Sequence, residues 1–435
     1  MLDRRTLLAA GAFLAATPAL AAPKRPSRKF PKGFLWGAAT AGHQVEGNNV
    51  NSDSWLLENL DPTVFAEPSL DAANSFALWP RDLDLVKHMG LNSYRFSLEW
   101  ARIEPEPGRF SIAMLNHYKE IIEGCRSRGL TPVVTFNHFT TPRWFAADGG
   151  WTNPQAPSRF ALFCQVAARH LASGIGYALT LNEPNIPALL RAVLPASTIE
   201  GTGPMLRAAA HACGSKKFAS ANIFIAQDID PMMEQMIAGH KAARAAIKTI
   251  RPDLPVGLSL AMYDDQAVGK DSVRDTKRAE IYGPWLDAVK GDDFMGVQNY
   301  ERALWDSKGK LPAPEGAIVN YTGSEVYAPS LAGAVRFAHA ATGLPIIVTE
   351  HGVGIDDDTV RATLIPAALK DLKLLMDRER VPVLGYIHWS LLDNFEWGFG
   401  YRAKFGLVSV DRNNFTRTPK PSAKIFGAIA ARNSL

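Results

Sequence analysis

Eight short apolar segments recur along the chain, and each one ends in polar, aromatic or glycine residues. They cover residues 34–41, 93–100, 131–139, 176–183, 255–263, 293–300, 345–352 and 383–393. Their nearly continuous apolar character is typical of parallel strands that are buried on both faces. The pattern therefore predicts eight strands of one parallel sheet.

Helical patterns fill the intervals between these segments. Apolar residues three or four positions apart precede the second, third and fourth strands, and longer examples follow, at 83–89, 118–125, 160–167, 232–250 and 362–376. Strands that alternate with helices belong to the α/β class, and eight of them predict a (β/α)8 TIM barrel built as a single domain. A doubly wound open sheet is the alternative, but it would carry a Gly-rich phosphate-binding turn after an early strand, and the sequence has none.

Two connections between the predicted strands are longer than a minimal barrel requires. They are residues 185–230, after the fourth strand, and residues 301–343, after the sixth. Long loops at the carboxyl ends of barrel strands usually form the entrance to a binding site. We expect the same here, with surface insertions of no function as the alternative.

The first 21 residues form a segment of a different kind. The charged run Asp3-Arg4-Arg5 precedes an uncharged stretch over 6–16, and small residues follow at 19–21. This order is typical of a secretory signal, and the apolar stretch is too short to anchor the chain in a bilayer. The paired arginines resemble a twin-arginine signal, with a general secretory signal as the alternative. We expect a bacterial protein exported to the periplasm or the medium, with residues 22–29 as a flexible lead-in to a barrel over 30–435.

The charge and the cysteine content of the chain argue against several classes of binding site. The chain has 47 basic and 43 acidic residues, a net charge of +4, which indicates neither nucleic acid nor a membrane surface as a partner. Cys125, Cys164 and Cys213 are odd in number and widely spaced, so we expect free thiols. The Cys and His residues show no spacing that would hold a metal ion.

Polar and aromatic residues stand at the carboxyl ends of the predicted strands, where a barrel would bring them together. They are Gln44, Glu46, Arg95, His138, Asn182, Glu183, Asn299, Tyr300, Glu350 and Trp389. Glycoside hydrolysis requires two carboxyl groups, polar groups for the sugar hydroxyls and an aromatic platform. The sequence lacks the signatures of zinc hydrolysis, of an acyl-transfer serine and of a dinucleotide site. This set therefore favours glycoside hydrolysis.

Longer strings of the sequence resemble glycoside hydrolase family 1, the retaining β-glycosidases, from about residue 30 to the C-terminus. The matching strings are FLWGAATAGHQVEG (34–47), YRFSLEWARIEP (94–105), TLNEP (180–184), VTEHG (348–352) and WSLLDNFEWGFGYRAKFGLVSVD (389–411). The resemblance implies a barrel fold, cleavage of a small β-glycoside or oligosaccharide with retention of configuration, and no metal or organic cofactor. It does not indicate an oligomeric state.

The resemblance also implies a role for each site residue. Glu183, in Asn-Glu-Pro, would be the acid/base, and Glu350 would be the nucleophile. Arg95 and Tyr300 would contact that nucleophile, so we expect Arg95 to depress the pKa of Glu350 while the charge of Glu350 keeps Glu183 protonated. The predicted sugar-binding residues are Gln44, His138, Asn182, Tyr300, Trp389, Glu396 and Trp397.

Other residues of the same segments have a structural interpretation. Glu46 and Glu99 are expected to be ion-pair or hydrogen-bond partners, and His138, taken alone, would be a core histidine. The tryptophans expected to serve packing are Trp36, Trp100 and Trp151.

The chain departs from the family pattern at several positions, which are Phe139, Glu301, His351 and residues 74–76. Glu396 is retained, and its carboxylate would repel a phosphate, so we expect an unphosphorylated, glucose-like sugar. Two alternative functions remain open. One is a transglycosylase with the same intermediate, for which the apolar stretch 189–194 would exclude water, and the other is a sugar-binding barrel without activity.

Overall fold

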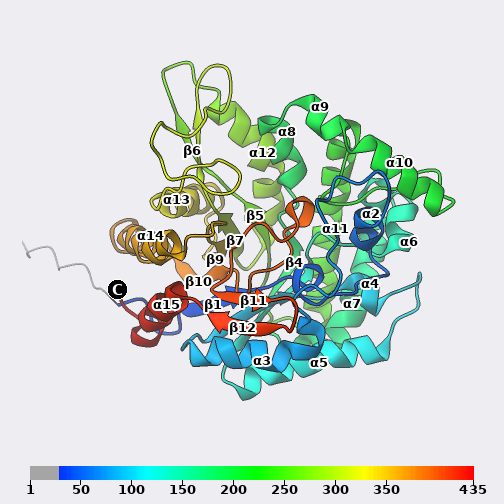
Figure 1. Cartoon of the computed structure of the whole chain (residues 1–435), viewed down its shortest axis with the longest axis horizontal. Helices are drawn as coiled ribbons and strands as arrows, with labels where there is room; N and C mark the ends of the chain where they lie inside the picture. The colour runs from blue at the N-terminus through cyan, green and yellow to red at the C-terminus, as the bar shows by residue number, and fades with distance from the viewer. Residues whose placement is uncertain (1–28) are drawn as a thin grey trace, which may run out of the picture.

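Each of the eight predicted apolar segments forms one strand of a closed parallel barrel (Figure 1). The computed structural model describes residues 29–435. The barrel strands are β1 (Leu35–Ala39), β2 (Ser93–Ser97), β3 (Thr131–Asn137), β4 (Tyr177–Asn182), β5 (Val256–Ala261), β7 (Met295–Asn299), β9 (Ile346–His351) and β10 (Val383–Trp389). Each strand pairs with the next along the chain, and β10 pairs with β1 to close the ring. The TIM barrel is confirmed, and the open-sheet alternative is wrong.

Helices surround this barrel, and four of the five predicted helical patterns lie inside them, while the fifth, 83–89, extends one residue past the end of its helix. The α-helices of residues 29–435 are α1 (Gly42–Val45), α2 (Asp53–Glu58), α3 (Ser75–His88), α4 (Trp100–Ile103), α5 (Ile112–Ser127), α6 (Arg143–Ala147), α7 (Ala156–Leu171), α8 (Ile186–Val193), α9 (Ala196–Glu200), α10 (Gly203–Ala212), α11 (Ile229–Ile250), α12 (Arg274–Ala288), α13 (Ser330–Thr342), α14 (Asp358–Glu379) and α15 (Pro421–Arg432). Short 3-10 turns are η1 (Gly150–Thr152), η2 (Ala172–Gly174), η3 (Ala226–Asp228), η4 (Val289–Gly291) and η5 (Trp397–Phe399).

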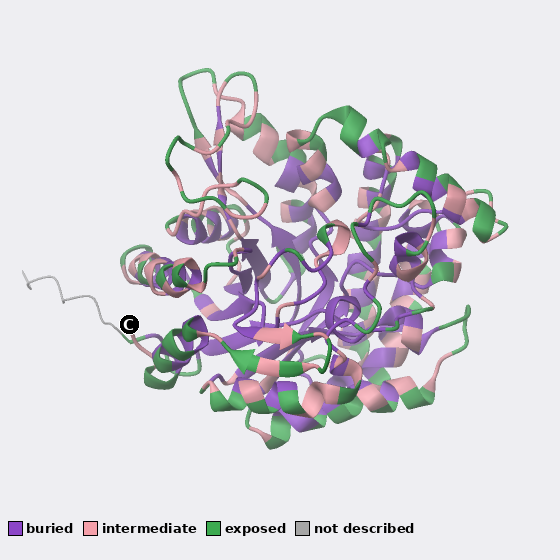
Figure 2. Cartoon of the chain, viewed as in Figure 1, coloured by how far each residue is buried: buried purple, intermediate pink, exposed green. Residues whose placement is uncertain are grey.

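The long helices pack because their apolar residues fall on one face. In α5 the Ser111 side chain accepts a hydrogen bond from Met114 N at the start, and Leu115, Tyr118 and Ile122 are buried at spacings of three and four residues. Figure 2 shows the result for the whole molecule, with the barrel strands buried and the outer faces of the helices exposed. The barrel is therefore surrounded by helices that pack through their apolar faces.

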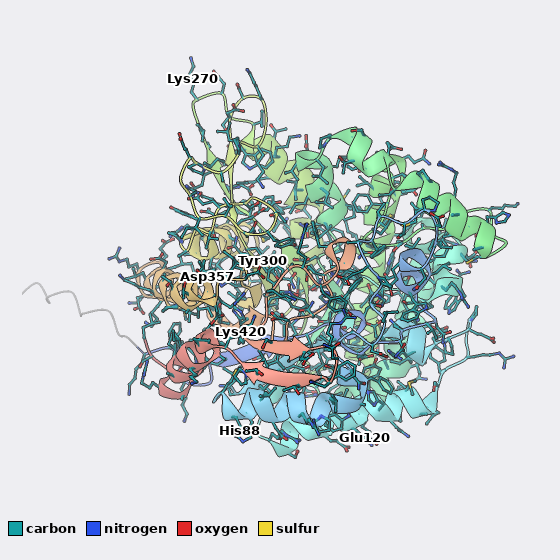
Figure 3. All side chains as sticks on the ribbon, viewed as in Figure 1. His88, Glu120, Lys270, Tyr300, Asp357 and Lys420 are labelled. Atoms are coloured by element: carbon teal, nitrogen blue, oxygen red, sulfur yellow. The ribbon has the colours of Figure 1, made fainter. Side chains whose placement is uncertain are left out.

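Two small sheets lie outside the barrel and were not predicted. Strands β6 (Asp264–Ala267) and β8 (Arg302–Trp305) pair in parallel, and β11 (Val408–Asp411) and β12 (Thr416–Pro419) form an antiparallel hairpin. Each has four residues and mixed polarity, so no continuous apolar segment marks it. Lys270 lies at the far tip of the β6 region, well away from Tyr300 at the centre of the molecule (Figure 3).

The two long connections meet at the surface of the molecule. Val193, at the end of α8, and residues from the stretch 302–325 line a cavity of about 380 Å³. The two connections therefore border one hollow, and their role as the entrance to a binding site stays a prediction.

The predicted signal over 1–21 and most of the predicted lead-in lie outside the described residues. The last residue of that lead-in, Lys29, pairs with Ser434, and Phe30 N donates to Asn433 O at 2.9 Å, so the two ends of the described chain lie side by side. Within residues 29–435 no helix has the length and hydropathy needed to cross a membrane. All three cysteines are free, as expected, with Cys213 the least buried.

Candidate active site

The carboxyl ends of the barrel strands gather the predicted site residues. Arg95 belongs to β2, Asn182 ends β4, Glu183 follows it, and Glu350 belongs to β9. All four are buried, with at most 9% of each residue exposed. Tyr300, one residue beyond β7, is labelled at the centre of the molecule in Figure 3. Strands of one barrel thus direct groups that are distant in sequence to a common point.

The Glu350 carboxylate is held by two donors. Arg95 Nη1 forms a close ion pair with Glu350 Oε1, and the Tyr300 hydroxyl donates to Oε2 at 2.5 Å. Burial raises the pKa of Glu350, whereas Arg95 and the Tyr300 hydrogen bond both lower it. Arg95 thus lowers this pKa, as predicted, although burial raises it by more.

Glu183 has different surroundings. Its backbone is left-handed, with φ of 45°, which directs the side chain from the end of β4 into the site. Burial raises the pKa of Glu183 well above its usual value, and the charges of Glu350 and Glu396 raise it further. Arg95 opposes this effect, but its guanidinium is paired with Glu350.

The two carboxyl groups therefore titrate in a definite order. Glu350 has a cation and a hydroxyl donor to stabilise its charge, and Glu183 faces the anion of Glu350. In a coupled buried pair the group with the better-stabilised anion ionises first. The site thus favours an ionised Glu350 beside a protonated Glu183.

Asn182 lies between the Arg95–Glu350 ion pair and His138, one of the predicted sugar-binding residues. Its Oδ1 accepts hydrogen bonds from Arg95 Nη2 at 2.5 Å and from Gln298 Nε2 at 2.8 Å. The Asn182 amide nitrogen consequently faces His138 Nε2, at 3.3 Å. Burial, and then the charge of Arg95, lower the pKa of His138 well below its usual value, so this imidazole is neutral.

The remaining predicted sugar-binding residues surround His138 and Glu396. The His138 ring lies nearly parallel to Trp389, with centroids 5.6 Å apart, and to Trp397, at 6.2 Å. Gln44 Nε2 donates to Glu396 Oε2 at 3.1 Å. Burial and the charge of Glu350 raise the pKa of Glu396 to about 8. All ten predicted site residues are therefore linked by contacts or by electrostatic coupling.

The residues with a structural interpretation lie as expected. Glu46 pairs with Arg102 at 2.8 Å, and Glu99 accepts hydrogen bonds from Asn49, Thr140 and the backbone of His43. The three packing tryptophans, Trp36, Trp100 and Trp151, are at most 2% exposed and belong to the main hydrophobic core.

Three positions that depart from the family pattern have structural partners. His351 Nδ1 contacts the Tyr386 hydroxyl at 2.8 Å, and Glu301 pairs with Lys310 at 3.2 Å. Phe139 has a left-handed backbone and meets Trp397 edge-on, at 5.3 Å between ring centroids. Two of these side chains thus lie outside the catalytic contacts, while Phe139 touches a predicted sugar-binding residue.

Two side chains of the site were not among the predicted residues. Gln298 lies two positions before Tyr300 on β7, and the period of two in a strand was the signal that could have found it. Tyr321, from the long connection after β7, packs edge-on against Phe405, and the charges of Glu396 and Glu183 contribute to raising its pKa, after burial. No strand or helix contains Tyr321, so periodicity gave no signal for it.

The polar atoms of the site are suited to the hydroxyl groups of a neutral sugar. Within residues 29–435 no group of three or more His, Cys, Asp or Glu residues is arranged to hold a metal ion. Three buried polar atoms of the site, Gln44 Oε1, His138 Nδ1 and Gln298 Oε1, have no hydrogen-bond partner in the protein. Such atoms are usually satisfied by water or by a bound molecule.

Comparisons with known proteins agree with this geometry. A β-glucosidase of Agrobacterium sp. (strain ATCC 21400) is 28% identical over 94% of this chain and 97% of its own. Among solved structures, β-glycosidase BGL167 is 45% identical over 93% and 98% of the two chains, with a TM-score of 0.88. β-glucosidase 1317 is 40% identical over 92% and 98%, also with a TM-score of 0.88. Residues 26–198 and 320–435 match the description Glycosyl hydrolase family 1, and the chain belongs to that family.

Proposed function

We propose that the protein is a retaining β-glycosidase that hydrolyses an unphosphorylated, glucose-like β-glycoside by double displacement. One observation carries this proposal: Glu350 is held by Arg95 and Tyr300, whereas burial and the anion of Glu350 keep Glu183 protonated. A retaining site requires this division between an ionised nucleophile and a protonated acid.

In the first step Glu350 attacks the anomeric carbon. An ester bond forms between a Glu350 oxygen and that carbon, and the bond to the aglycone oxygen breaks. Glu183 donates its proton to the departing oxygen, so the leaving group is a neutral alcohol. Arg95 and Tyr300 hold the carboxylate in position before attack.

In the second step water hydrolyses the ester. Ester formation removes the negative charge of Glu350, which lowers the pKa of Glu183 because its strongest anionic neighbour is gone. Glu183 then accepts a proton from water as the water attacks the anomeric carbon, and the Glu350 carboxylate is released. Two inversions leave the product with the configuration of the substrate.

The sugar is recognised by the surrounding polar and aromatic groups. Gln44 Oε1 and His138 Nδ1 are unpartnered in the protein and are suited to sugar hydroxyls, and Trp389 provides an apolar platform. The Glu396 carboxyl, which accepts a hydrogen bond from Gln44, offers no positive charge to a phosphate, and this supports an unphosphorylated sugar. The named β-glucosidase relatives favour hydrolysis over the transglycosylase alternative.

The experiment that tests this function follows the configuration of the first product. Proton NMR during cleavage of 4-nitrophenyl β-D-glucoside should show the β-anomer of glucose before the α-anomer appears by mutarotation. Mass spectrometry of protein quenched during turnover of an activated 2-fluoroglucoside should place the sugar on the peptide that contains Glu350. The α-anomer as first product would contradict the proposal.

We propose in addition that the protein is exported, by the twin-arginine route. The order of charged, apolar and small residues over 1–21 supports this proposal. Expression of the full chain in a bacterium should give mature protein in the periplasm, and N-terminal sequencing should begin close to residue 22. Replacing Arg4 and Arg5 with Lys should leave the precursor in the cytoplasm; unchanged export would favour the general secretory route.

A further inference from the structure

A row of four nearly parallel rings connects the two predicted sugar-binding tryptophans. Trp389 lies against His138, His138 against Trp397, and Trp397 against His43, with interplanar angles of 14°, 11° and 7°. The centroids of Trp397 and His43 are 5.6 Å apart. His43 thus ends the row on the side away from Trp389, and the proposed mechanism assigns it no role.

His43 is fixed by more than packing. It is 1% exposed, and its Nε2 lies 3.3 Å from Glu58 Oε2 in α2. The other Glu58 oxygen accepts a close hydrogen bond from Ser69 Oγ, and the His43 backbone N–H donates to Glu99 Oε1 at 2.9 Å. The imidazole plane is therefore held from the ring edge and from the main chain, by residues of three separate segments.

Trp397 needs such support. Its φ is 49°, a left-handed conformation that is an outlier for a bulky side chain and persists only where the surroundings impose it. The indole is half-buried, with Phe139 edge-on to it and His43 nearly parallel to it. Near-parallel aromatic contacts of this kind contribute about 0.5–1.5 kcal/mol beyond buried area. The contact with His43 is thus large enough to select one indole orientation.

The same histidine is coupled to the rest of the sugar-binding set through the chain. Gln44 is its neighbour in α1, and Gln44 Nε2 donates to Phe395 O at 2.7 Å and to Glu396 Oε2 at 3.1 Å. Phe395 also meets the His43 ring, at 6.0 Å. Movement of His43 would therefore disturb Trp397 and also the Gln44 side-chain amide, which orients Glu396.

We propose that His43, held by Glu58, is a positioning residue that fixes the plane of Trp397 and so sets the affinity of the site for the sugar. This inference rests on the proposed function, because Trp397 matters only if the site binds a sugar. We expect the Trp397 ring to contact bound sugar equally in the ground state and the transition state. Loss of the His43 ring, which positions Trp397, should therefore raise KM and leave kcat nearly unchanged.

Four variants separate the ring from its hydrogen bond. His43→Ala removes both, His43→Gln keeps a polar group without the parallel ring, and His43→Phe keeps a ring without the hydrogen bond. Glu58→Gln keeps an acceptor for Nε2. With 4-nitrophenyl β-D-glucoside we expect KM to rise about tenfold in the Ala and Gln variants and about twofold in the Phe and Glu58 variants. Recovery of affinity by Phe is the signature of positioning by the ring.

A buried histidine elsewhere provides the matched control. His240, in α11, is fully buried beside Thr180 and Asp292, outside the site. His240→Ala should lower the thermal unfolding midpoint about as much as His43→Ala and leave KM unchanged. Binding of the non-hydrolysed analogue 4-nitrophenyl 1-thio-β-D-glucoside, measured by calorimetry, should weaken in parallel with the KM values.

The outcomes distinguish this inference from the function it rests on. If the wild type cleaves no β-glycoside and binds no thioglycoside, the proposed function fails. If the wild type is active but KM stays the same in His43→Ala and His43→Gln, the positioning role is wrong and the function stands. Equal KM increases in the Phe, Gln and Ala variants would also overturn the role of the ring. His43→Gln is close in size to the native residue, so it remains informative if His43→Ala does not fold.

Discussion

The ends of β9 and β4 place the same residue type in one pocket, yet they give it opposite properties. At β9, Glu350 lies within the strand and accepts from Arg95 and from Tyr300. At β4, Glu183 lies one residue beyond the strand, in a left-handed conformation, and its strongest charged neighbour is the anion of Glu350. Burial is common to both glutamates, so the difference between them comes from their neighbours. Chemical role here is assigned by local donors and charges, not by residue type.

The largest expected effect comes from removing the β9 carboxylate. Glu350→Ala should lower kcat by several orders of magnitude, because the neighbouring Glu183 is placed and protonated to act as an acid and cannot form the ester in its stead. Added azide or formate should partly restore cleavage of an activated aryl glycoside, and NMR should show a product of inverted configuration. Full activity of Glu350→Ala without added anion would remove Glu350 from its role.

Changing the β4 carboxyl should have an effect that depends on the leaving group. Glu183→Gln should lower kcat/KM for alkyl glycosides and disaccharides about 10²–10⁴-fold, because their alcohols leave only with a proton. A dinitrophenyl glycoside needs little acid assistance, so its first step should survive and the glycosyl adduct on Glu350 should accumulate. Mass spectrometry of the intact protein would detect that adduct. Equal losses on good and poor leaving groups would show that Glu183 is not the acid.

Removing one of the two hydrogen-bond donors of Glu350 should raise its pKa, so that Glu350 becomes more like Glu183. Tyr300→Phe removes the hydrogen bond at 2.5 Å, which favours the ionised carboxylate. The pKa of Glu350 should rise, so the acidic limb of the kcat/KM profile should move to higher pH while the alkaline limb, set by Glu183, stays in place. The loss at the optimum should be about 10- to 100-fold, the size of one hydrogen bond to a charged group. Movement of the alkaline limb instead would mean that Tyr300 acts on Glu183.

The barrel and most of the site could be predicted from the sequence because their signals are local. Eight apolar segments marked the strands, and the residue at each strand end was expected to face one pocket, as Arg95 and Glu350 do. Tyr300 lies in the interval 199–319 that the family match leaves out, yet its strand-end position was sufficient to find it.

The parts that could not be predicted depend on contacts between distant segments. Tyr321 belongs to an irregular connection, and His43 stands out only once its ring is found beside Trp397. Arg95 lowers the pKa of Glu350, as predicted, but burial, which no sequence pattern measures, raises that pKa by more. Sequence indicates which groups meet, but the balance of burial and charge among them needs the folded structure.

The smallest expected effect concerns a third carboxyl, that of Glu396, which can be compared with the other two. Glu396 resembles Glu183 more than Glu350, since burial and the charge of Glu350 raise its pKa to about 8. The unfolded chain loses this proton near pH 4.5 and the folded protein keeps it until about pH 8. The folded state therefore binds more protons across that window, and the stability contributed by this group falls as pH rises.

Glu396→Gln removes this penalty while retaining a hydrogen-bonding side chain of the same shape. Its thermal midpoint relative to the wild type should rise by about 4–6 °C between pH 4.5 and pH 8, although sugar binding weakens. A difference between the two proteins that is constant with pH would mean that Glu396 is ionised throughout, and that its surroundings are closer to those of Glu350.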